Sequence, residues 1–336
     1  MIESTIGRVA AGEDLSMREM ADAIGSIMEG RCGEGEIGVL LTALATKGET
    51  VEEVAGAATA MREHMTPIQT AREGLIDTCG TGGDFSGTFN ISTAAALITS
   101  AAGVPVAKHG NRAMTSKTGS ADVLAALGVN VEADTPVVER CLNEVGICFC
   151  FAQRLHPAMK HVAPVRKQLG VRTIFNLLGP LCNPASAPFQ LLGVGQPEIT
   201  GLLAEALVML GTKHSLVVNG ADGLDEVTLN GATHIIESGD QSTRQFNWTP
   251  ADFGLNESSL ESIQVETAEQ SAAMVRDVLH GNPGAARDIV IINSAAALWT
   301  AGKSESPTDC AAMAAEAIDS GAANNVLAKL AELSNA

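Results

Sequence analysis

The fold is decided by residues 75–93, Leu75-Ile-Asp-Thr-Cys-Gly-Thr-Gly-Gly-Asp-Phe-Ser-Gly-Thr-Phe-Asn-Ile-Ser-Thr93. The short apolar start of this stretch predicts a strand, and a glycine-rich loop then leads to a helix predicted over 94–102. Glycine has no Cβ, so the backbone at Gly80, Gly82 and Gly83 can adopt positive φ and direct successive N–H groups at one anion. The stretch therefore predicts a phosphate-binding loop.

Polar residues at the end of this loop strengthen the prediction. Asn90, Ser92 and Thr93 supply donors where the next helix presents its free N–H groups and the positive end of its dipole. Asp84 would repel a phosphate unless a cation or a sugar hydroxyl met it. Its presence predicts a ligand more elaborate than inorganic phosphate.

Upstream of the loop, residues 1–66 predict helices only. Ser16 with Glu19 and Thr50 with Glu53 match capping boxes that open helices. Three apolar stripes follow at helical spacing: Met20, Ile24, Ile27 and Met28; Ile37, Leu40, Leu41 and Leu44; Val54, Ala58, Met61 and Met65. The stripes indicate an ordinary helical core, with a dimerisation face as the less favoured interpretation.

Downstream, short apolar runs alternate with helical stretches. The runs lie at 75–77, 104–107, 147–151, 190–194, 215–218, 233–236 and 288–293, the last of which equally fits a helix. This alternation predicts an α/β fold with a largely parallel sheet covered by helices, plus a small all-α N-terminal domain. We expect the small helical domain at 1–70, joined by part of 155–182, which has no strand pattern, and the large domain at 71–336.

A second polar cluster, Lys108-His109-Gly110-Asn111-Arg112, follows the run at 104–107, with Ser116, Lys117, Gly119 and Ser120 beyond it. Loops after parallel strands meet at one edge of the sheet, so this basic cluster should lie beside the glycine loop. The alternative is a solvated surface loop, and His109 alone is explained by a backbone hydrogen bond that holds the loop.

Two further groups have chemical potential. Asp225 and Glu226, with Asp222 nearby, offer hard oxygen ligands for Mg²⁺, although Asp-Gly pairs also form ordinary turns. Arg166 and Lys167 offer charge for a carboxylate, and the guanidinium fork suits that task, although a solvated helix face is the simpler interpretation of either residue.

Composition restricts the partners. The 336 residues carry a net charge of −18, which argues against nucleic acid or an anionic membrane surface as partner. Between residues 108 and 172, however, there are nine Lys or Arg and only five Asp or Glu, and this local positive charge suits a small anionic substrate. The sequence shows neither a signal peptide nor a membrane-length apolar segment. Seven scattered cysteines indicate reduced thiols and a cytoplasmic location, with Cys79 as a packing residue.

Four motifs stand in this order along the chain: D-T-C-G-T-G-G-D-x-x-x-T-F-N-I-S-T at 77–93, K-H-G-N-R at 108–112, N-L-L-G-P-L-x-N-P at 176–184 and D-G-L-D-E at 222–226. Together they resemble the anthranilate phosphoribosyltransferase family of tryptophan biosynthesis. The chain departs from the common family pattern at Met114-Thr115, where Val-Ser is frequent.

The resemblance implies transfer of phosphoribose from 5-phosphoribosyl 1-diphosphate to the amine of anthranilate with Mg²⁺. It also implies a homodimer through the helical domain, and leaves open whether an amidotransferase subunit associates. By position, the residues implied to hold phosphoribosyl diphosphate are Gly80, Gly83, Asp84, Thr88, Asn90, Ile91, Ser92, Thr93, Lys108, His109, Gly110, Asn111, Arg112, Ala113, Met114, Thr115, Ser116 and Ser120. Those implied to engage Mg²⁺ are Ser92, Asp225 and Glu226, and those implied to meet anthranilate are Gly80, Asn111 and Arg166. Electrostatic and positioning roles in catalysis are implied for Lys108, Asn111 and Arg166.

Two alternatives remain at this point. A pyrimidine nucleoside phosphorylase shares the fold, but it needs neither a metal pair at Asp225 and Glu226 nor Arg166 for a carboxylate. A non-enzymatic relative that binds nucleic acid is disfavoured by the acidic composition.

Overall fold

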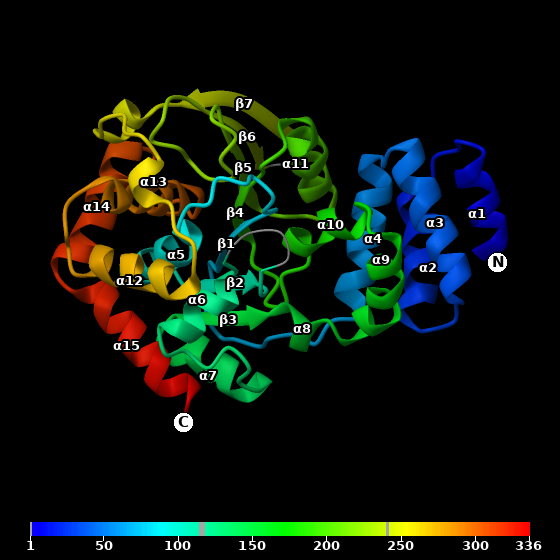
Figure 1. The fold of residues 1–336 in the computed structure, drawn as a ribbon, viewed down its shortest axis with the longest axis horizontal. Coiled ribbons are helices and arrows are strands. Elements are labelled where there is room, and N and C mark those ends of the chain that lie inside the picture. The colour runs from blue at the N-terminus through cyan, green and yellow to red at the C-terminus, as the bar shows by residue number, and fades with distance from the viewer. Residues whose placement is uncertain (1, 114–117, 240–241) are drawn as a thin grey trace.

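The structure, a computed structural model, describes residues 2–113, 118–239 and 242–336. It consists of a helical bundle at one end and a larger body built on a central sheet (Figure 1). The N-terminus lies at the outer end of the bundle, and the C-terminus lies on the larger body.

The bundle forms where the sequence predicts helices: α1 (Ile2–Ala10), α2 (Met17–Met28), α3 (Glu34–Lys47) and α4 (Val51–Glu63). Ser16 and Thr50 each accept an N–H of the helix they open, and both predicted capping boxes are confirmed. The apolar stripes are buried, except that Met65 lies beyond α4 and is half-buried. Burial of these stripes against one another therefore makes the core of the bundle.

The sheet has seven strands in the order β3-β2-β1-β4-β5-β6-β7. Its strands are β1 (Ile76–Gly80), β2 (Val106–Gly110), β3 (Ile147–Phe151), β4 (Phe189–Gly193), β5 (His214–Gly220), β6 (Thr233–Gly239) and β7 (Ser242–Trp248). Pairs from β3 to β5 are parallel, and β6 and β7 add antiparallel. The predicted largely parallel sheet is confirmed.

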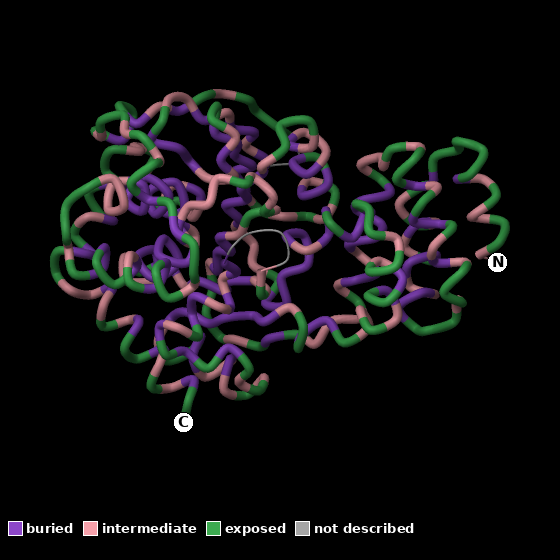
Figure 2. Tube along the Cα trace, in the orientation of Figure 1, coloured by how far each residue is buried: buried purple, intermediate pink, exposed green. Residues whose placement is uncertain are grey.

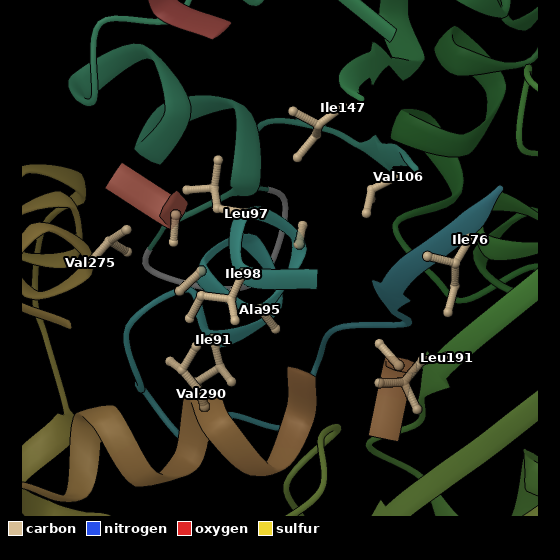
Figure 3. Packing of buried hydrophobic residues seen from close by; sticks show 14 of the residues in the cluster. Ile76, Ile91, Ala95, Leu97, Ile98, Val106, Ile147, Leu191, Val275 and Val290 are labelled. Atoms are coloured by element: carbon tan, nitrogen blue, oxygen red, sulfur yellow. The ribbon is translucent and has the colours of Figure 1, made fainter. Parts of the chain in front are cut away.

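Helices cover both faces of the sheet, so the strands β1 to β5 are mostly buried (Figures 1 and 2). They are α5 (Ile91–Ala101), α6 (Ser120–Ala126), α7 (Thr135–Glu144), α11 (Thr200–Met209), α12 (Ala268–Leu279), α13 (Ala285–Thr300), α14 (Pro307–Asp319) and α15 (Ala322–Ser334). Figure 3 shows Ile91 and Ile98 of α5 packed beside Val290 of α13. The helix that follows the glycine loop is thus fixed in the middle of the main core.

Between β3 and β4 the chain forms only short helices, as the lack of a strand pattern predicts. They are α8 (Ala152–Leu155), η1 (Pro157–His161), α9 (Ala163–Leu169), α10 (Phe175–Leu178) and η2 (Gly179–Leu181). Val162 and Val165 are buried in one hydrophobic cluster with Leu40 and Leu41 of α3. This segment therefore returns to the bundle and joins it to the sheet.

The structure resolves one alternative left open by the sequence, adds one strand that was not predicted and corrects two local predictions. The run at 288–293 is helical, because α13 is buried on nearly every side and therefore apolar all round. β7 is an exposed edge strand with polar residues, so the sequence has no apolar run that would have predicted it. The helix predicted over 94–102 begins at Ile91. Finally, β2 extends to Gly110, so Lys108 lies within the strand and not in the loop after it.

Candidate active site

A cavity of about 440 Å³ lies beyond the carboxyl ends of β1 and β2. Three segments distant in sequence line it: residues 79–92, residues 108–112 with 118–120, and the pair Asp225 and Glu226. Parallel strands bring the loops at their carboxyl ends together, which is why three separate motifs converge. The arrangement places glycine N–H groups, cationic side chains and carboxylates around one space.

The glycine loop has the backbone that its sequence predicts, but part of it serves the protein. Gly82 and Gly83 have φ of 68° and 79°, whereas Gly80 does not adopt positive φ. A Cβ at Gly80 would lie 2.4 Å from Asp225 Oδ2, so glycine is required there by the approach of the acidic loop. The Gly82 N–H donates to the same oxygen at 2.9 Å. The loop therefore holds Asp225 as well as offering N–H groups to the cavity.

The start of α5 forms one wall. Asn90 caps the helix, because its Oδ1 accepts the N–H of Thr93 at 3.2 Å. Ile91 and Ser92 line the cavity. Thr93 is buried beneath the wall and does not line it, although the sequence predicted a ligand donor there. Thr88 lies on the same wall, its hydroxyl 3.2 Å from that of Ser86.

Three carboxylates, those of Asp84, Asp225 and Glu226, gather at the cavity. Burial, then the neighbouring Asp84 and then Glu226 raise the pKa of the Asp225 carboxyl well above its ordinary value. Burial also raises the pKa of Glu226 to about 7, with Asp84 adding to the rise while Lys108 and hydrogen bonds from Ser92 oppose it. Such a cluster of like charges is relieved when a cation binds.

The donor set fits Mg²⁺ when phosphate oxygens complete it. Within the described ranges, no three His, Cys, Asp or Glu side chains form a metal site on their own. Mg²⁺ commonly uses one or two carboxylates together with substrate phosphates, so Asp225 and Glu226 meet its requirement beside an anion site. Asp222 does not line the cavity, since its carboxylate accepts from Thr228 and Leu224 within a turn.

Lys108 and His109 are buried strand residues at the floor. The Lys108 Nζ donates to the Thr78 carbonyl at 2.6 Å and to Ser92 Oγ at 3.1 Å. His109 Nδ1 lies 3.0 Å from the Gly179 carbonyl, and burial lowers the pKa of its imidazole to about 3, with His156 contributing. His109 is thus a neutral ring hydrogen-bonded to the backbone, which agrees with the prediction that it makes a backbone hydrogen bond.

The loop after β2 is closed by an acid that sequence reasoning missed. Asp122 Oδ2 accepts from the N–H groups of Ala113 and Gly119 at 3.0 and 3.1 Å. Arg112 pairs with Asp122 and Glu132, so its charge is already neutralised. Asp122 is the third residue of α6, a position from which a carboxylate often accepts the N–H groups before a helix. This position is the sequence signal that could have predicted its role.

The remaining predicted residues of this loop divide into two groups. Asn111 and Ser120 line the cavity, and Gly110 is close enough to Ser120 that a Cβ would lie 2.2 Å from its hydroxyl. The predicted residues Met114, Thr115 and Ser116, with Lys117, lie outside the described residues.

Arg166 does not line this cavity. It lies half-buried on α9, with Nη2 3.2 Å from Asn176 Oδ1 and its guanidinium carbon 5.9 Å from the centre of the Phe175 ring. Lys167 is exposed beside it. The structure thus separates the predicted carboxylate-binding residue from the predicted phosphate-binding wall.

Several lining residues were not predicted. They are Cys79, Thr81, Phe85, Ser86, Gly87, Phe89 and Thr118. Most lie between predicted residues on the same loops, so continuity along the chain was the available signal. Burial raises the pKa of the Cys79 thiol well above its ordinary value, which agrees with its predicted packing role.

The fold and the cavity define the class. A helical bundle followed by an α/β domain matches two models of the glycosyl transferase family, the helical bundle domain over residues 3–65 and the a/b domain over residues 72–324. In the part of the chain that the structure describes, no helix is long and apolar enough to cross a membrane.

Relatives specify the class further. The chain is 54% identical over 329 residues to anthranilate phosphoribosyltransferase of Rhodospirillum rubrum, covering 98% of this chain and 94% of that one. It is 51% identical over 327 residues to the Rhodopirellula baltica enzyme of the same name, with 97% and 96% covered. The chain belongs to the anthranilate phosphoribosyltransferase family.

Solved structures of that family agree in fold. The crystal structure of the Thermus thermophilus protein matches with a TM-score of 0.93 and 42% identity, covering 98% of this chain and 99% of that chain. The Saccharomyces cerevisiae protein in complex with PRPP and Mg matches with a TM-score of 0.90 and 28% identity, covering 99% and 98%.

Proposed function

We propose that this protein transfers the 5-phosphoribosyl group from 5-phosphoribosyl 1-diphosphate to the amine of anthranilate. The products are N-(5-phosphoribosyl)anthranilate and diphosphate, in the second step of tryptophan biosynthesis from chorismate. The observation that carries the proposal is the cavity in which N–H donors, buried Lys108 and the Asp225–Glu226 pair converge. The relatives that match nearly the whole chain are named anthranilate phosphoribosyltransferase, which supports it.

The residues of the cavity suit departure of an anionic leaving group. As diphosphate leaves the anomeric carbon, negative charge grows on the leaving oxygen and positive charge grows on the sugar. N–H groups at the start of α5 and the ammonium of Lys108 would stabilise the leaving group. Asn111 would orient the aniline nitrogen in line. The neighbouring His109 is anchored to a carbonyl, so it does not supply a strong general base beside Asn111.

We propose Mg²⁺ as the cofactor, held by Asp225, Glu226 and the Ser92 hydroxyl. When bound, the ion would neutralise charge on the diphosphate. The raised pKa of both carboxyl groups supports the assignment, because burial and the neighbouring carboxylates disfavour their charged forms, and a bound cation would offset that cost. The phosphoribosyl diphosphate contacts of residues 80–93 and 108–120 are proposed on the same grounds.

For Arg166 we propose recognition of the anthranilate carboxylate. Its guanidinium is half-buried and donates to the neutral amide oxygen of Asn176, so its charge is available. Because Arg166 lies on α9, outside the phosphate cavity, this role requires anthranilate to bind between that helix and the sheet.

The activity is tested by incubating the protein with 5-phosphoribosyl 1-diphosphate, Mg²⁺ and anthranilate and following the fall of anthranilate fluorescence. A fall that depends on all three components is expected. Phosphorolysis of thymidine without any fall would instead identify a pyrimidine nucleoside phosphorylase.

We further propose two domains, 1–70 with part of 155–182 and 71–336, and a homodimer through the first. An apolar groove of about 790 Å³ runs between α1, α3 and α9, and Val39 on its rim is 52% exposed. Light scattering after gel filtration should give twice the mass of 34.6 kDa, and Val39→Lys should reduce the measured mass.

Free cysteines at all seven positions support a cytoplasmic location.

A further inference from the structure

A second cavity, of about 220 Å³, lies toward the opposite end of the sheet from the candidate active-site cavity. Its lining includes Asp77 and Gln190, the second residues of β1 and β4, and Thr212, which precedes β5. These three strands run parallel, so their amino ends meet here, whereas their carboxyl ends lie toward the other cavity. Among the described residues, the two cavities share none in their linings, so the second one is a separate site.

The second cavity also lies where the helical bundle meets the larger body. Arg62 of α4 lines it, together with Leu210 and Gly211 at the end of α11, and α4 is the bundle helix that packs against α11 (Figure 1). Ser186 and Gly211 in the lining are exposed, whereas Asp77 is buried. The cavity therefore opens to solvent on one side and has Asp77 at its inner end.

Asp77 has an oxygen without a partner at this cavity. Its Oδ1 accepts the His109 N–H at 3.0 Å, but its Oδ2 has no hydrogen-bond partner within the described part of the chain, although the residue is only 1% exposed. Burial raises the pKa of the Asp77 carboxyl, and the neighbouring Asn183 amide and the His109 N–H oppose the rise. A buried carboxylate oxygen is costly unless a donor meets it, so the geometry calls for a donor in the cavity.

Arg62 brings an unpaired positive charge to the same cavity. Its Nε donates to the Leu181 carbonyl at 2.8 Å, and its Nη1 lies 3.5 Å from the Leu210 carbonyl. A guanidinium has five N–H donors, so these two contacts leave donors for a ligand. No carboxylate of the described residues forms an ion pair with Arg62. The half-buried cation therefore calls for an anionic acceptor.

Hydrogen bonds place the acid and the cation on neighbouring parts of the cavity wall. Gln190 is the register partner of Asp77 on the adjacent strand, and its Nε2 donates to the Pro180 carbonyl at 2.6 Å. Arg62 binds the next carbonyl along the chain, that of Leu181. Asp77 and Arg62 are thus connected through two successive carbonyls, yet among the described residues they do not pair with one another. A ligand can lie between them.

We propose that this cavity binds a small α-amino acid as its zwitterion, with the ammonium at Asp77 Oδ2 and the carboxylate at the Arg62 guanidinium. A simple anion would leave the Asp77 oxygen without a donor, and a simple amine would leave Arg62 without an acceptor. The cavity volume of about 220 Å³ corresponds to about seven water molecules at roughly 30 Å³ each, which is the size of an amino acid with a small side chain. The bound ligand would join α4 of the bundle to β1 of the sheet.

Calorimetry of the full chain with glycine, L-alanine and L-serine tests the proposal. We expect at least one of the three to bind with a Kd below about 1 mM, and acetate and methylamine, which each carry one half of the zwitterion, to bind at least about tenfold more weakly. Asp77→Asn keeps an acceptor for the His109 N–H and removes the charge, so it should raise the Kd of the amino acid about tenfold. Arg62→Met should raise that Kd to a similar extent, about tenfold, because it removes the acceptor's partner.

Ser215→Ala is the matched control, since it removes a buried cross-strand hydrogen bond of the same sheet at a residue that lines neither cavity. It should lower the melting temperature without changing the Kd of the amino acid. Saturation with 5-phosphoribosyl 1-diphosphate should also leave that Kd unchanged, and competition would place the amino acid in the other cavity and overturn the inference. The comparison of amino acid, acetate and methylamine uses the parent protein, so it decides even where a variant does not fold. No binding of the three amino acids, which would leave water as the content of the cavity, or acetate binding as tightly as they do, would overturn the inference. An unchanged Kd in both folded charge variants would do the same.

Discussion

The two walls of the cavity treat charge in opposite ways. On the basic wall, Lys108 donates hydrogen bonds to the Thr78 carbonyl and the Ser92 hydroxyl. Arg112 forms ion pairs with Asp122 and Glu132. On the acidic wall, Asp225 and Glu226 lie together, and their pKa values rise. The charges of the basic wall have partners within the protein, whereas the clustered carboxylates of the acidic wall have only Lys108 to oppose the rise of the Glu226 pKa.

The difference indicates which wall depends on a bound ion. A preorganised cation stabilises developing negative charge without reorganising during the reaction, which suits Lys108 to the leaving group. Paired carboxylates cannot remain close at low cost unless a cation joins them. We therefore expect changes on the acidic wall to act through metal, and changes on the basic wall to act without it.

The largest effect is expected from Asp225→Asn combined with Glu226→Gln. Removal of both proposed ligands should lower Mg²⁺-dependent kcat/KM by about a thousandfold, since each catalytic electrostatic contact contributes on the order of 3 kcal/mol and such contacts are not additive. Steady-state rates across a Mg²⁺ titration measure it.

Arg166→Ala is the contrasting variant for that experiment. It should mainly raise KM for anthranilate, because the half-buried guanidinium lies away from the phosphate cavity. An identical kinetic defect from the two changes would contradict the division between metal-binding and carboxylate-binding roles.

On the basic wall, Lys108→Met should lower kcat/KM for phosphoribosyl diphosphate by about a hundredfold at every Mg²⁺ concentration. Arg112→Ala is its matched control, with an expected loss of less than about tenfold, because Arg112 already pairs with two acids at an exposed site. A Lys108→Met defect that excess Mg²⁺ repairs would show that the two walls do not act independently.

The contrast also marks what sequence could and could not predict. Asp225, Glu226 and the glycine loop follow strands directly, so their place at one edge of the sheet followed from parallel topology. Lys108 was predicted in a loop because the apolar run ends at Ala107. The strand continues through this buried lysine, whose Nζ donates a hydrogen bond to the Thr78 carbonyl of the neighbouring strand β1.

Contacts between residues far apart in the sequence could not be predicted from local patterns either. Gly80 was predicted to need glycine for its own backbone freedom, but the need comes from Asp225, 145 positions later. The pairing of Asp122 with two loop N–H groups and the separation of Arg166 from the cavity likewise depend on tertiary packing.

That long-range contact gives a smaller expected effect. Gly80→Ala places a methyl group 2.4 Å from Asp225 Oδ2, which must displace the acidic wall, so we expect activity to fall about tenfold and the Mg²⁺ requirement to rise. Gly83→Ala is the control for backbone strain, because its φ is 79° and its Cβ would meet open space. Similar Mg²⁺ requirements in the two variants would exclude displacement of Asp225 as the cause.

The smallest effect is a dependence of stability on pH. Because burial raises the pKa of Glu226 to about 7, the native state binds more protons than the unfolded state between the ordinary pKa of this carboxyl and pH 7. Stability should therefore fall as pH rises through this window, and Mg²⁺ with diphosphate should restore more of the melting temperature at about pH 8 than at about pH 6, where protons compete with the ion. Calorimetric melting temperatures with and without Mg²⁺ measure this. The Asp225→Asn, Glu226→Gln protein should lose the Mg²⁺ effect at both pH values, since the like charges that the ion relieves are absent; a preserved Mg²⁺ effect would place the ion elsewhere.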